Sequence, residues 1–527
     1  MTKSLNQDSA ILYHNADDTI FLIDTPHSIA LAQESLSSPT RKQDHDALQS
    51  QGVPALPSRE TSTKTRWLLS ASPLEAPFPS TEPKSHVARA KVLERIPPSE
   101  QRFHGKFIQP LVESALYALR AEYQTHRGQW CLPRHVCDDD TRQMDMTTRP
   151  VGRQFTSAKK RRHEDDREGE NSVRISTSCG SSFEAPPVIL SSTAVNSFES
   201  LSELKDSIVK NVSSHTATLA ITSFPDGHID LEYIIPPGAN FVLSTLPLSQ
   251  PKKRSPTELI ALDHPISAIP RHQKFNLLLF DPPWPNRSVR RSGHYQVNSY
   301  SEIDVLTQRL SDILRVHAYH SGSSPVEDSA SCHGTCMQSR ASLAAIWITN
   351  AEKARRTAYE ALISTGFRVA EEWVWVKTTV DGQPISAIDG LWRKPYEILV
   401  IGRAEQGGRT VDLNAAAPVI PTETVAESNV HEHDLLSIDP ASIRRRVIAA
   451  VPDLHSRKPN LKEVFERVFF KDGDAGARSG LDDSDARIQS YSALEVFARN
   501  LTAGWWSCGN EVLKFNVREC WVDGFDS

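Results

Sequence analysis

The C-terminal half of the chain is predicted to fold as an α/β domain with a mostly parallel, doubly wound sheet. The run Leu277-Leu278-Leu279-Phe280 is apolar without a break, which is typical of a strand buried on both faces. Similar runs recur at 344–349 and 372–377, and a segment with the apolar spacing of a helix separates them. Strands and helices that alternate through short connections favour a parallel sheet with helices on both faces.

The remaining elements of this domain follow in order along the chain. Asn350 is expected to cap a helix that ends at Gly366, and a second helix is predicted at 461–470. Further strands are predicted at 397–401, 494–498 and 512–515. Polar inserts near 319–340, 405–429 and 472–490 are expected to be loop expansions.

The N-terminal half is predicted to contain fewer regular elements. A strand is expected at 19–23, followed by a short helix near Leu31. Apolar residues from 107 to 123 follow helical spacing, provided that Pro110 lies in the first turn of this helix. Trp130 is expected to join the same apolar cluster.

The domain organisation follows from these patterns and from composition. A hairpin is predicted between 217 and 235, because two β-rich runs flank Pro225-Asp226-Gly227. The predicted regions are a mostly disordered stretch (1–100), a helical segment (101–136), a disordered charged linker (137–200), a small β-rich accessory region (201–254) and the α/β domain (255–527).

Composition excludes several classes of protein. The formal net charge of −6 argues against a chain that coats a polyanion, so nucleic-acid contacts would come from local basic patches. Seven scattered cysteines without an N-terminal signal peptide favour a reducing intracellular compartment. No apolar run approaches membrane-spanning length, which predicts a soluble protein without membrane contacts. Cys332, His333 and Cys336 lack a second ligand pair, so no metal site is expected.

Two basic clusters bear on localisation. The run Lys159-Lys160-Arg161-Arg162 lies in the charged linker and predicts import into the nucleus, with the cytoplasm as a second location. An ordinary solvated charge run is the alternative interpretation. The shorter run Lys252-Lys253-Arg254 is a second candidate signal.

The candidate catalytic residues are Asp281-Pro282-Pro283-Trp284, directly after the first buried strand. Two prolines end the strand, so a carboxylate and an indole lie at its carboxyl end, where open α/β sheets bind ligands. Asp281 and the Pro282 carbonyl are suited to accept the N–H groups of an exocyclic base amine, while Trp284 offers a face for an unstacked base. A turn beside a buried tryptophan is the structural alternative.

The loop that follows is rich in arginine. Arg287, Arg290 and Arg291 stand beside serines and a glycine, an arrangement that suits phosphate groups of a nucleic acid. An ordinary solvated loop is the alternative.

With these residues the chain resembles the MT-A family of adenine-N6 methyltransferases, in the branch called methyltransferase-like protein 4. The similarity covers about 255–518. It rests on Asp281-Pro282-Pro283-Trp284 with Asn286 and Ser288–Ser292, on Trp347–Asn350, Glu372-Trp373, Trp375–Lys377 and Lys394–Glu397, and on Lys458-Pro459, Leu494-Glu495, Phe497–Leu501 and Gly509–Phe515.

The resemblance implies a Rossmann-like methyltransferase domain in which the catalytic motif precedes the donor-binding strand, S-adenosylmethionine as donor, and a nucleic-acid adenine as acceptor. It implies donor contacts for Asp281, Lys458, Glu495, Arg499, Asn500, Asn510, Glu511 and Asp263. It implies acceptor contacts for Asn286, Arg287, Ser288, Arg290, Arg291, Tyr295, Trp375, Lys377, Lys394, Tyr396 and Glu397. Tyr396 has a packing role as its alternative. The chain departs from the branch at Arg457, where a histidine is usual.

Three functions remain open at this point. The first is an adenine-N6 methyltransferase acting on small nuclear RNA, including a 2′-O-methylated adenosine, or on DNA. The second is a catalytically silent nucleic-acid-binding subunit of a methyltransferase complex. The third is an amine methyltransferase acting on a protein glutamine or a free base, against which the arginine-rich loop argues. The sequence does not decide between RNA and DNA, because both present the same adenine edge.

Overall fold

The structure is a computed structural model of the 527-residue chain. It describes residues 8–34, 66–124, 128–136, 186–223, 228–246, 265–266, 268–284, 303–320, 341–405, 441–454, 456–471, 488 and 490–523. Among these residues no helix is long and apolar enough to span a membrane. No three His, Cys, Asp or Glu side chains of the described chain cluster in a way that could hold a metal ion.

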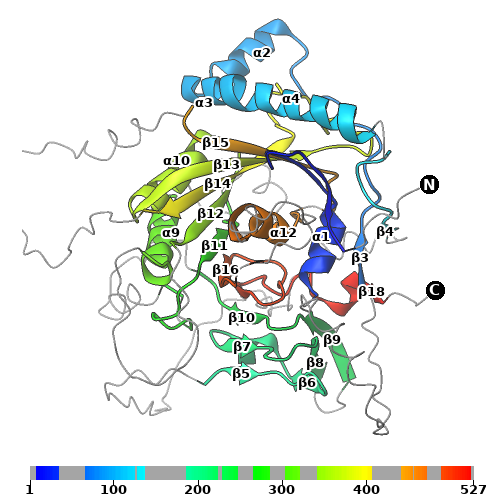
Figure 1. The fold of residues 1–527 in the computed structure, drawn as a ribbon, viewed down its shortest axis with the longest axis vertical. Coiled ribbons are helices and arrows are strands. Elements are labelled where there is room, and N and C mark those ends of the chain that lie inside the picture. Colours follow the sequence, from blue (N-terminus) through cyan, green and yellow to red (C-terminus); the bar gives the residue numbers. More distant parts are fainter. Residues whose placement is uncertain are drawn as a thin grey trace, which may run out of the picture.

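One large mixed sheet organises the described residues (Figure 1). Its strands in spatial order are β1 (Ile11–His14), β2 (Ile20–Ile23), β15 (Arg444–Ala450), β13 (Phe367–Lys377), β14 (Tyr396–Ala404), β12 (Leu343–Ile348), β11 (Leu277–Phe280), β16 (Ala493–Val496), β17 (Trp506–Gly509), β10 (Asn240–Leu243), β7 (Ile208–Lys210) and β5 (Val188–Ile189).

The centre of the sheet is parallel, as expected, with one exception. Strands β12, β11, β16, β17 and β10 are consecutive parallel neighbours, and β13, β15 and β2 form a second parallel set. Strand β14 between the two sets is antiparallel to both of its neighbours. The connection from β13 explains this direction. Residues 378–395 leave β13 and enter β14 at the same edge of the sheet, so the two strands are antiparallel. A parallel pair would need a connection that crosses to the opposite edge.

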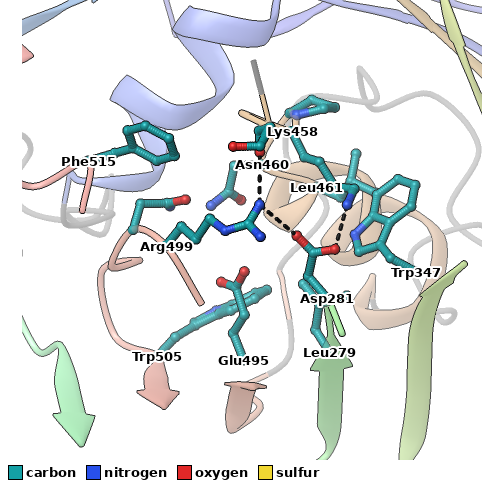
Figure 2. A pocket seen from close by; sticks show the side chains of 13 residues that line it. Leu279, Asp281, Trp347, Lys458, Asn460, Leu461, Glu495, Arg499, Trp505 and Phe515 are labelled. Carbon is teal, nitrogen blue, oxygen red and sulfur yellow. Dashed lines mark hydrogen bonds and ion pairs between the residues drawn. The ribbon is translucent and has the colours of Figure 1, made fainter. Parts of the chain in front are cut away.

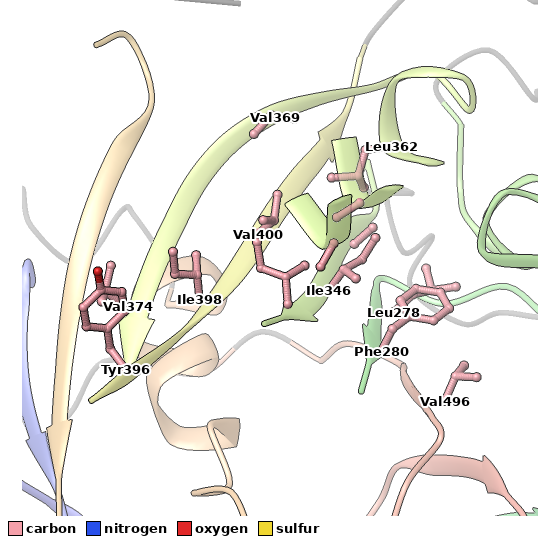
Figure 3. Close-up of a cluster of buried hydrophobic side chains, with 14 of the residues drawn as sticks. Leu278, Phe280, Ile346, Leu362, Val369, Val374, Tyr396, Ile398, Val400 and Val496 are labelled. Carbon is pink, nitrogen blue, oxygen red and sulfur yellow. The ribbon is translucent and has the colours of Figure 1, made fainter. Parts of the chain in front are cut away.

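Helices cover both faces of the sheet, which confirms the doubly wound arrangement. One face packs against α4 (Gln109–Leu119), α9 (Ile303–His317) and α10 (Glu352–Ile363). The other packs against α12 (Lys462–Phe465) and its continuation, the π-helix η6 (Glu466–Phe470). Figure 3 shows the first core, in which side chains of β11, β12, β13 and β14 meet Leu362 of α10. Because strands alternate their side chains, consecutive residues of β11 enter opposite cores.

The first hundred residues contain more structure than the sequence analysis expected. The predicted strand and helix are present as β2 and α1 (Thr25–Ala32), and β2 is a member of the main sheet through its parallel pairing with β15. Strand β3 (Arg66–Ser70) and helix α2 (His86–Leu93) were not predicted. Short segments of this kind are stabilised by partners far away in the chain, so their own composition carries little signal.

A helical layer follows α2 and lies over the β15 and β13 side of the sheet (Figure 1). It comprises α3 (Pro98–Phe103), the π-helices η2 (His104–Ile108) and η3 (Arg120–Gln124), and α4 between them. Pro110 lies in the first turn of α4, and Trp130 joins its core, as predicted.

His104 joins this layer to the sheet. Its Nε2 lies 2.9 Å from the Asn350 carbonyl, which can only accept, so this nitrogen carries the proton. Its Nδ1 then accepts a hydrogen bond from the Tyr396 hydroxyl at 2.9 Å. Burial lowers the pKa of His104 to about 4, so the ring is neutral at physiological pH.

Asn350 does not cap α10, which is a correction to the expectation. Its side-chain amide donates to the Tyr396 carbonyl instead, at 2.7 Å. The Glu352 N–H at the start of α10 donates to the Glu100 carboxylate from the helical layer, at 2.9 Å. A carboxylate at a helix N-terminus accepts a hydrogen bond from an otherwise unpaired N–H and interacts favourably with the positive end of the helix dipole.

The region from 186 to 246 belongs partly to the main sheet. Strands β5, β7 and β10 extend that sheet, while β6 (Val195–Phe198), β8 (Ala217–Ser223) and β9 (His228–Ile235) form a separate small sheet. Strands β8 and β9 are the predicted hairpin. Strands β5 and β6 lie within 137–200, where a disordered linker was expected, and the 3₁₀-helix η4 (Leu201–Leu204) follows them.

The C-terminal end differs from the prediction at one strand. Residues 512–515 form turns, and the strand that follows β16 is β17. Val512 and Leu513 are buried because they pack against the β8–β9 side of the molecule. Phe515 is also buried. After it come the 3₁₀-helix η9 (Arg518–Cys520) and β18 (Trp521–Asp523), which pairs with β3 beside β4 (His135–Val136).

The fold predicts that the N-terminal strand stabilises the domain. Phe21 of β2 is fully buried, so Phe21→Ala should lower the free energy of unfolding by about 3–5 kcal/mol, the usual cost of emptying a core phenylalanine site. Urea denaturation followed by circular dichroism measures this change. The matched control is Phe78→Ala, because Phe78 is 57% exposed. Equal midpoints for the two variants would contradict the integration of β2 into the sheet.

Candidate active site

The candidate site lies at the edge of the sheet where the parallel strands end. Strands β11, β12, β13 and β16 run in the same direction, so their carboxyl ends share one edge, and antiparallel β14 begins there. Asp281 directly follows β11, Lys377 ends β13 and Glu397 is the second residue of β14. The arrangement brings residues that are distant in sequence to one place, as the sequence analysis expected for Asp281.

An alternating chain of ionic side chains crosses this edge, and we refer to it as the ion chain. The Lys377 Nζ lies 2.6 Å from Glu397, whose other oxygen is 3.4 Å from the Lys458 Nζ. The same Lys458 Nζ lies 2.5 Å from the Asp281 Oδ1, and the Asp281 Oδ2 is 3.7 Å from Arg499. The chain continues through Glu511 to Lys514, with N–O distances of 3.3 and 3.1 Å. Figure 2 shows its central part.

Lys458 occupies the middle of the ion chain. Burial alone would lower the pKa of its ammonium, but the Asp281 and Glu397 carboxylates outweigh burial and raise it. The same pairing acts on Glu397: burial would raise its pKa, but Lys377 and Lys458 lower it to about 2. These groups are therefore charged at neutral pH.

The loop that carries Lys458 is held from several sides. Ser456 has a positive φ of 67°, a backbone conformation that is uncommon for residues other than glycine. Its carbonyl accepts a hydrogen bond from Arg499 at 3.3 Å. Arg457, where the family branch usually has a histidine, pairs with Asp453 at 2.6 Å and lies over the Phe515 ring. This departure therefore leaves the Lys458 contacts intact.

A pocket opens beside the ion chain, with about 520 Å³ of empty space including the part open to solvent. Polar groups at its wall come from Asp281, Lys458, Asn460, Glu495, Arg499 and Asn500, and apolar ones from Leu279, Trp347, Leu461, Trp505 and Phe515. Apolar walls with a few convergent polar groups are typical of a site for a small organic ligand.

Glu495 lies in the pocket wall one residue before the end of β16. Burial, with a smaller contribution from the Asp281 carboxylate, raises the pKa of Glu495 to about 8. Its carboxyl group is therefore protonated at neutral pH and can donate a hydrogen bond as well as accept one.

Trp284 is fixed by the neighbouring strand. Its indole N–H donates to the Trp347 carbonyl at the end of β12, at 2.7 Å, and its backbone N–H donates to the Pro282 carbonyl at 2.9 Å. The ring is partly buried against the core. The Pro282 carbonyl, expected to accept from a base amine, thus already has one partner, and a carbonyl oxygen retains a second lone pair.

Two expected acceptor residues lie elsewhere. Tyr396 is only 1% exposed and lies on the opposite face of β14 from Glu397, where it bonds His104. It is therefore a packing residue, because neighbours on a strand point to opposite faces. Trp375 is on the same face as Glu397, but its side chain is buried in an edge-to-face contact with Trp347, with ring centroids 6.0 Å apart.

The remaining residues that were expected to contact the donor or the acceptor fall into two groups: those that the structure describes and those outside the described residues. Asn510 is exposed after β17, Asn500 faces the pocket, and Lys394 lies in the segment before β14. Asp263, Asn286, Arg287, Ser288, Arg290, Arg291 and Tyr295 lie outside the described residues, as do the basic runs at 159–162 and 252–254 and the Cys332–Cys336 motif.

The sequence analysis missed several residues of the pocket wall. Asn460, Trp505 and Phe515 face the pocket but were not proposed as contacts. Asn460 is held by Thr502, with a hydrogen bond of 2.8 Å to its hydroxyl. The sequence signal for Asn460 was its position two residues after Lys458, because a loop that brings Lys458 to the sheet edge also brings Asn460 there.

The pKa of Glu495 gives a test by pH. The unfolded chain releases this proton near pH 4.5, whereas the folded protein retains it up to about pH 8. The contribution of Glu495 to folding stability should therefore fall with rising pH across this window. The Glu495→Gln variant cannot ionise, so its urea midpoint relative to wild type should rise from pH 5 to pH 8 and level off above. A difference that is constant over this range would contradict a buried neutral carboxyl.

Comparison with known proteins finds a family match for part of the chain. The MT-A70 family model matches residues 335–435, a stretch that contains β12, β13 and β14. The chain is 33% identical over 254 residues to the N6-methyladenosine RNA methyltransferase MTA1 of Cryphonectria parasitica, covering 47% of this chain and 55% of that protein.

Two further relatives extend the match. MTA1 of Pyricularia oryzae is 26% identical over 530 residues, covering 98% of this chain and 96% of that one. The human N(6)-adenine-specific methyltransferase METTL4 is 28% identical over 309 residues, covering 58% and 47%. The alignments thus span about half of the Cryphonectria and human relatives and nearly all of the Pyricularia one. Residues 335–435 thus match the MT-A70 family, and the relatives with which the chain aligns include METTL4.

Proposed function

We propose that this chain is an S-adenosylmethionine-dependent methyltransferase that methylates the N6 amine of adenine in nucleic acid. The observation that carries the proposal is the ion chain, in which Asp281 of the catalytic motif contacts Lys458 and Arg499 of the expected donor site. The match of residues 335–435 to the MT-A70 family and the names of the relatives support the same chemistry. We also propose the permuted motif order of the family, with β11 preceding the donor strand β16 in the chain.

The chemistry of the pocket fits the donor. Lys458 would hold the carboxylate of the methionine part, since a buried carboxylate requires a cationic partner. Asp281 would accept from its amino group, and Arg499 with Glu511 would bond the ribose hydroxyls. Trp505 and Phe515 provide apolar surface for the remainder. When bound, the donor supplies an electrophilic methyl group on a sulfonium.

The acceptor would approach Asp281 from the side of Trp284. The exocyclic amine of adenine is a weak nucleophile, because its lone pair is delocalised into the ring. A carboxylate that accepts one N–H of the amine favours the orientation in which the lone pair faces the methyl group. Asp281 has four lone-pair sites on two oxygens, so its contact with Lys458 leaves sites for the amine. Hydrogen bonding between Trp284 and Trp347 keeps this side of the site rigid.

We propose RNA as the first acceptor to test. The Pyricularia relative that aligns over almost the whole chain bears the name of an RNA methyltransferase. The human relative's name specifies adenine without naming the nucleic acid, so DNA is the second arm of the experiment. We further propose nuclear import through the basic run Lys159-Lys160-Arg161-Arg162.

The decisive experiment measures methyl transfer to nucleic acid, with substitution of an aspartate outside the pocket as the control. Purified full-length protein is incubated with isotope-labelled S-adenosylmethionine and either total RNA or genomic DNA, followed by nucleoside mass spectrometry. Label is expected on adenine N6. Asp281→Asn keeps the size of the side chain but removes its charge, so label should fall at least about 100-fold, as when one preorganised polar group is lost. Asp304→Asn, at an exposed position in α9, should leave transfer unchanged.

The same experiment tests the silent-subunit alternative. A wild-type protein that transfers no label and also binds no donor in calorimetry would favour a catalytically silent subunit. Label on N6 that persists in Asp281→Asn would instead keep the enzyme but remove Asp281 from its mechanism.

A further inference from the structure

Residues 378–395, which join β13 to β14, lie at the same edge of the sheet as Asp281, and we call them the edge loop. The loop is packed against the N-terminal half of the chain. A Cβ on Gly382 would lie 2.4 Å from the Trp130 ring, so this glycine permits a close approach. The Phe78 N–H donates to the Ile385 carbonyl at 2.9 Å, and Arg89 lies 3.6 Å from Asp389.

The end of the edge loop is held especially firmly by backbone contacts. One oxygen of the Glu82 carboxylate accepts from the backbone N–H groups of Leu391 and Trp392, at 2.9 and 3.2 Å. Gly390 allows the tight turn just before them, because a Cβ there would meet the Arg393 carbonyl at 2.7 Å. The two ends of the loop are joined to each other, because the Lys377 N–H donates to the Pro395 carbonyl at 2.7 Å. The conformation at Trp392 is thus fixed without any contribution from its side chain.

Trp392 itself projects into solvent. Its side chain is 59% exposed, although its backbone N–H is bonded to the Glu82 carboxylate. Two cationic residues, Arg393 and Lys394, follow it directly. Arg393 is exposed, and within the described part of the chain it has no ion-pair partner. A large exposed ring on a rigid loop loses little conformational entropy when it binds a flat ligand, because its position is already set.

The edge loop is also near the candidate catalytic aspartate. Glu397 is five residues after Trp392, so their Cα atoms are at most about 19 Å apart at 3.8 Å per residue. Glu397 contacts Lys458, which contacts Asp281. Trp392 is therefore within reach of a nucleotide a few positions away from a target base held at Asp281. Positive charge beside an exposed ring is the combination that single-stranded nucleic acid requires, since bases stack on the ring and phosphates meet the cations.

We propose that Trp392 is a stacking platform for an unpaired base a few nucleotides from the target adenine, with Arg393 and Lys394 contacting the adjoining phosphates. This site rests on the proposed function of the chain. It deepens that function by assigning a single-stranded nucleic acid as the preferred substrate form. Arg393 is the exposed cation of the pair, whereas burial lowers the pKa of Lys394 and the nearby Asp389, Glu100 and Glu82 carboxylates only partly oppose this.

The test uses a fluorescein-labelled single-stranded RNA oligonucleotide with one central adenine and measures Kd by anisotropy, and KM and kcat by N6 methylation. Trp392→Ala should raise Kd and KM about five- to 100-fold, the range for loss of one stacked base, and leave kcat and donor affinity unchanged. Trp392→Phe keeps an aromatic face and should restore most of the binding. Tyr117→Ala removes another exposed aromatic, 75% exposed on α4, and should have no effect.

Each failure has a distinct meaning. If wild-type protein methylates the oligonucleotide and Trp392→Ala has the same Kd and KM, the platform is overturned while the proposed function stands. If wild-type protein neither binds nor methylates any RNA or DNA oligonucleotide, both are overturned. If Trp392→Ala changes the sedimentation of the protein while RNA binding is unchanged, the indole belongs to a protein interface and the platform is overturned.

Discussion

The ammonium of Lys458, held between the carboxylates of Asp281 and Glu397, is the interaction on which the site depends. It joins three segments that are far apart in sequence: the end of β11, the start of β14 and the loop before α12. Removing these charges from water is costly, and each gains compensation only from the opposite charge beside it. The alternation from Lys377 to Lys514 therefore constrains all of these segments together, because a missing member leaves its neighbours unpaired.

The position of Asp281 in the ion chain explains how its carboxylate could contact both the methyl donor and the acceptor base. Asp281 lies at the junction between the pocket and the side of the site where Trp284 is anchored. A donor in the pocket and a base beside Trp284 would meet at Asp281, so that the two reacting groups are positioned by the same side chain. Ser456 in the pocket wall and Phe497, between the wall residues Glu495 and Arg499 in the chain, both have positive φ angles, so the surrounding fold holds the backbone here in a strained conformation.

The sequence alone predicted most of the central domain and proposed as site residues all members of the ion chain except Lys514. Buried strands such as β11 and β12 are continuous apolar runs, and Lys377, Glu397, Lys458, Arg499 and Glu511 came from motifs around them. Interactions between distant segments were harder to predict. The direction of β14 depends on the return path of the edge loop, and β2 joins the sheet through a partner more than 400 residues later. The position of Tyr396 was predictable in principle, because Glu397 beside it must point to the opposite face of the strand.

The most direct measurement of the central claim is the affinity for S-adenosylmethionine by isothermal titration calorimetry, in Lys458→Met and in a matched variant of a nearby lysine. Lys462→Met is suitable, because Lys462 lies four residues further on, in α12, and its ammonium donates to the Ala503 carbonyl at 3.1 Å. We expect Lys458→Met to weaken donor binding at least tenfold, about 1.4 kcal/mol, and Lys462→Met to leave it unchanged. Equal donor affinity in wild type and Lys458→Met, with both proteins folded, would contradict the assignment of the ion chain as the donor site.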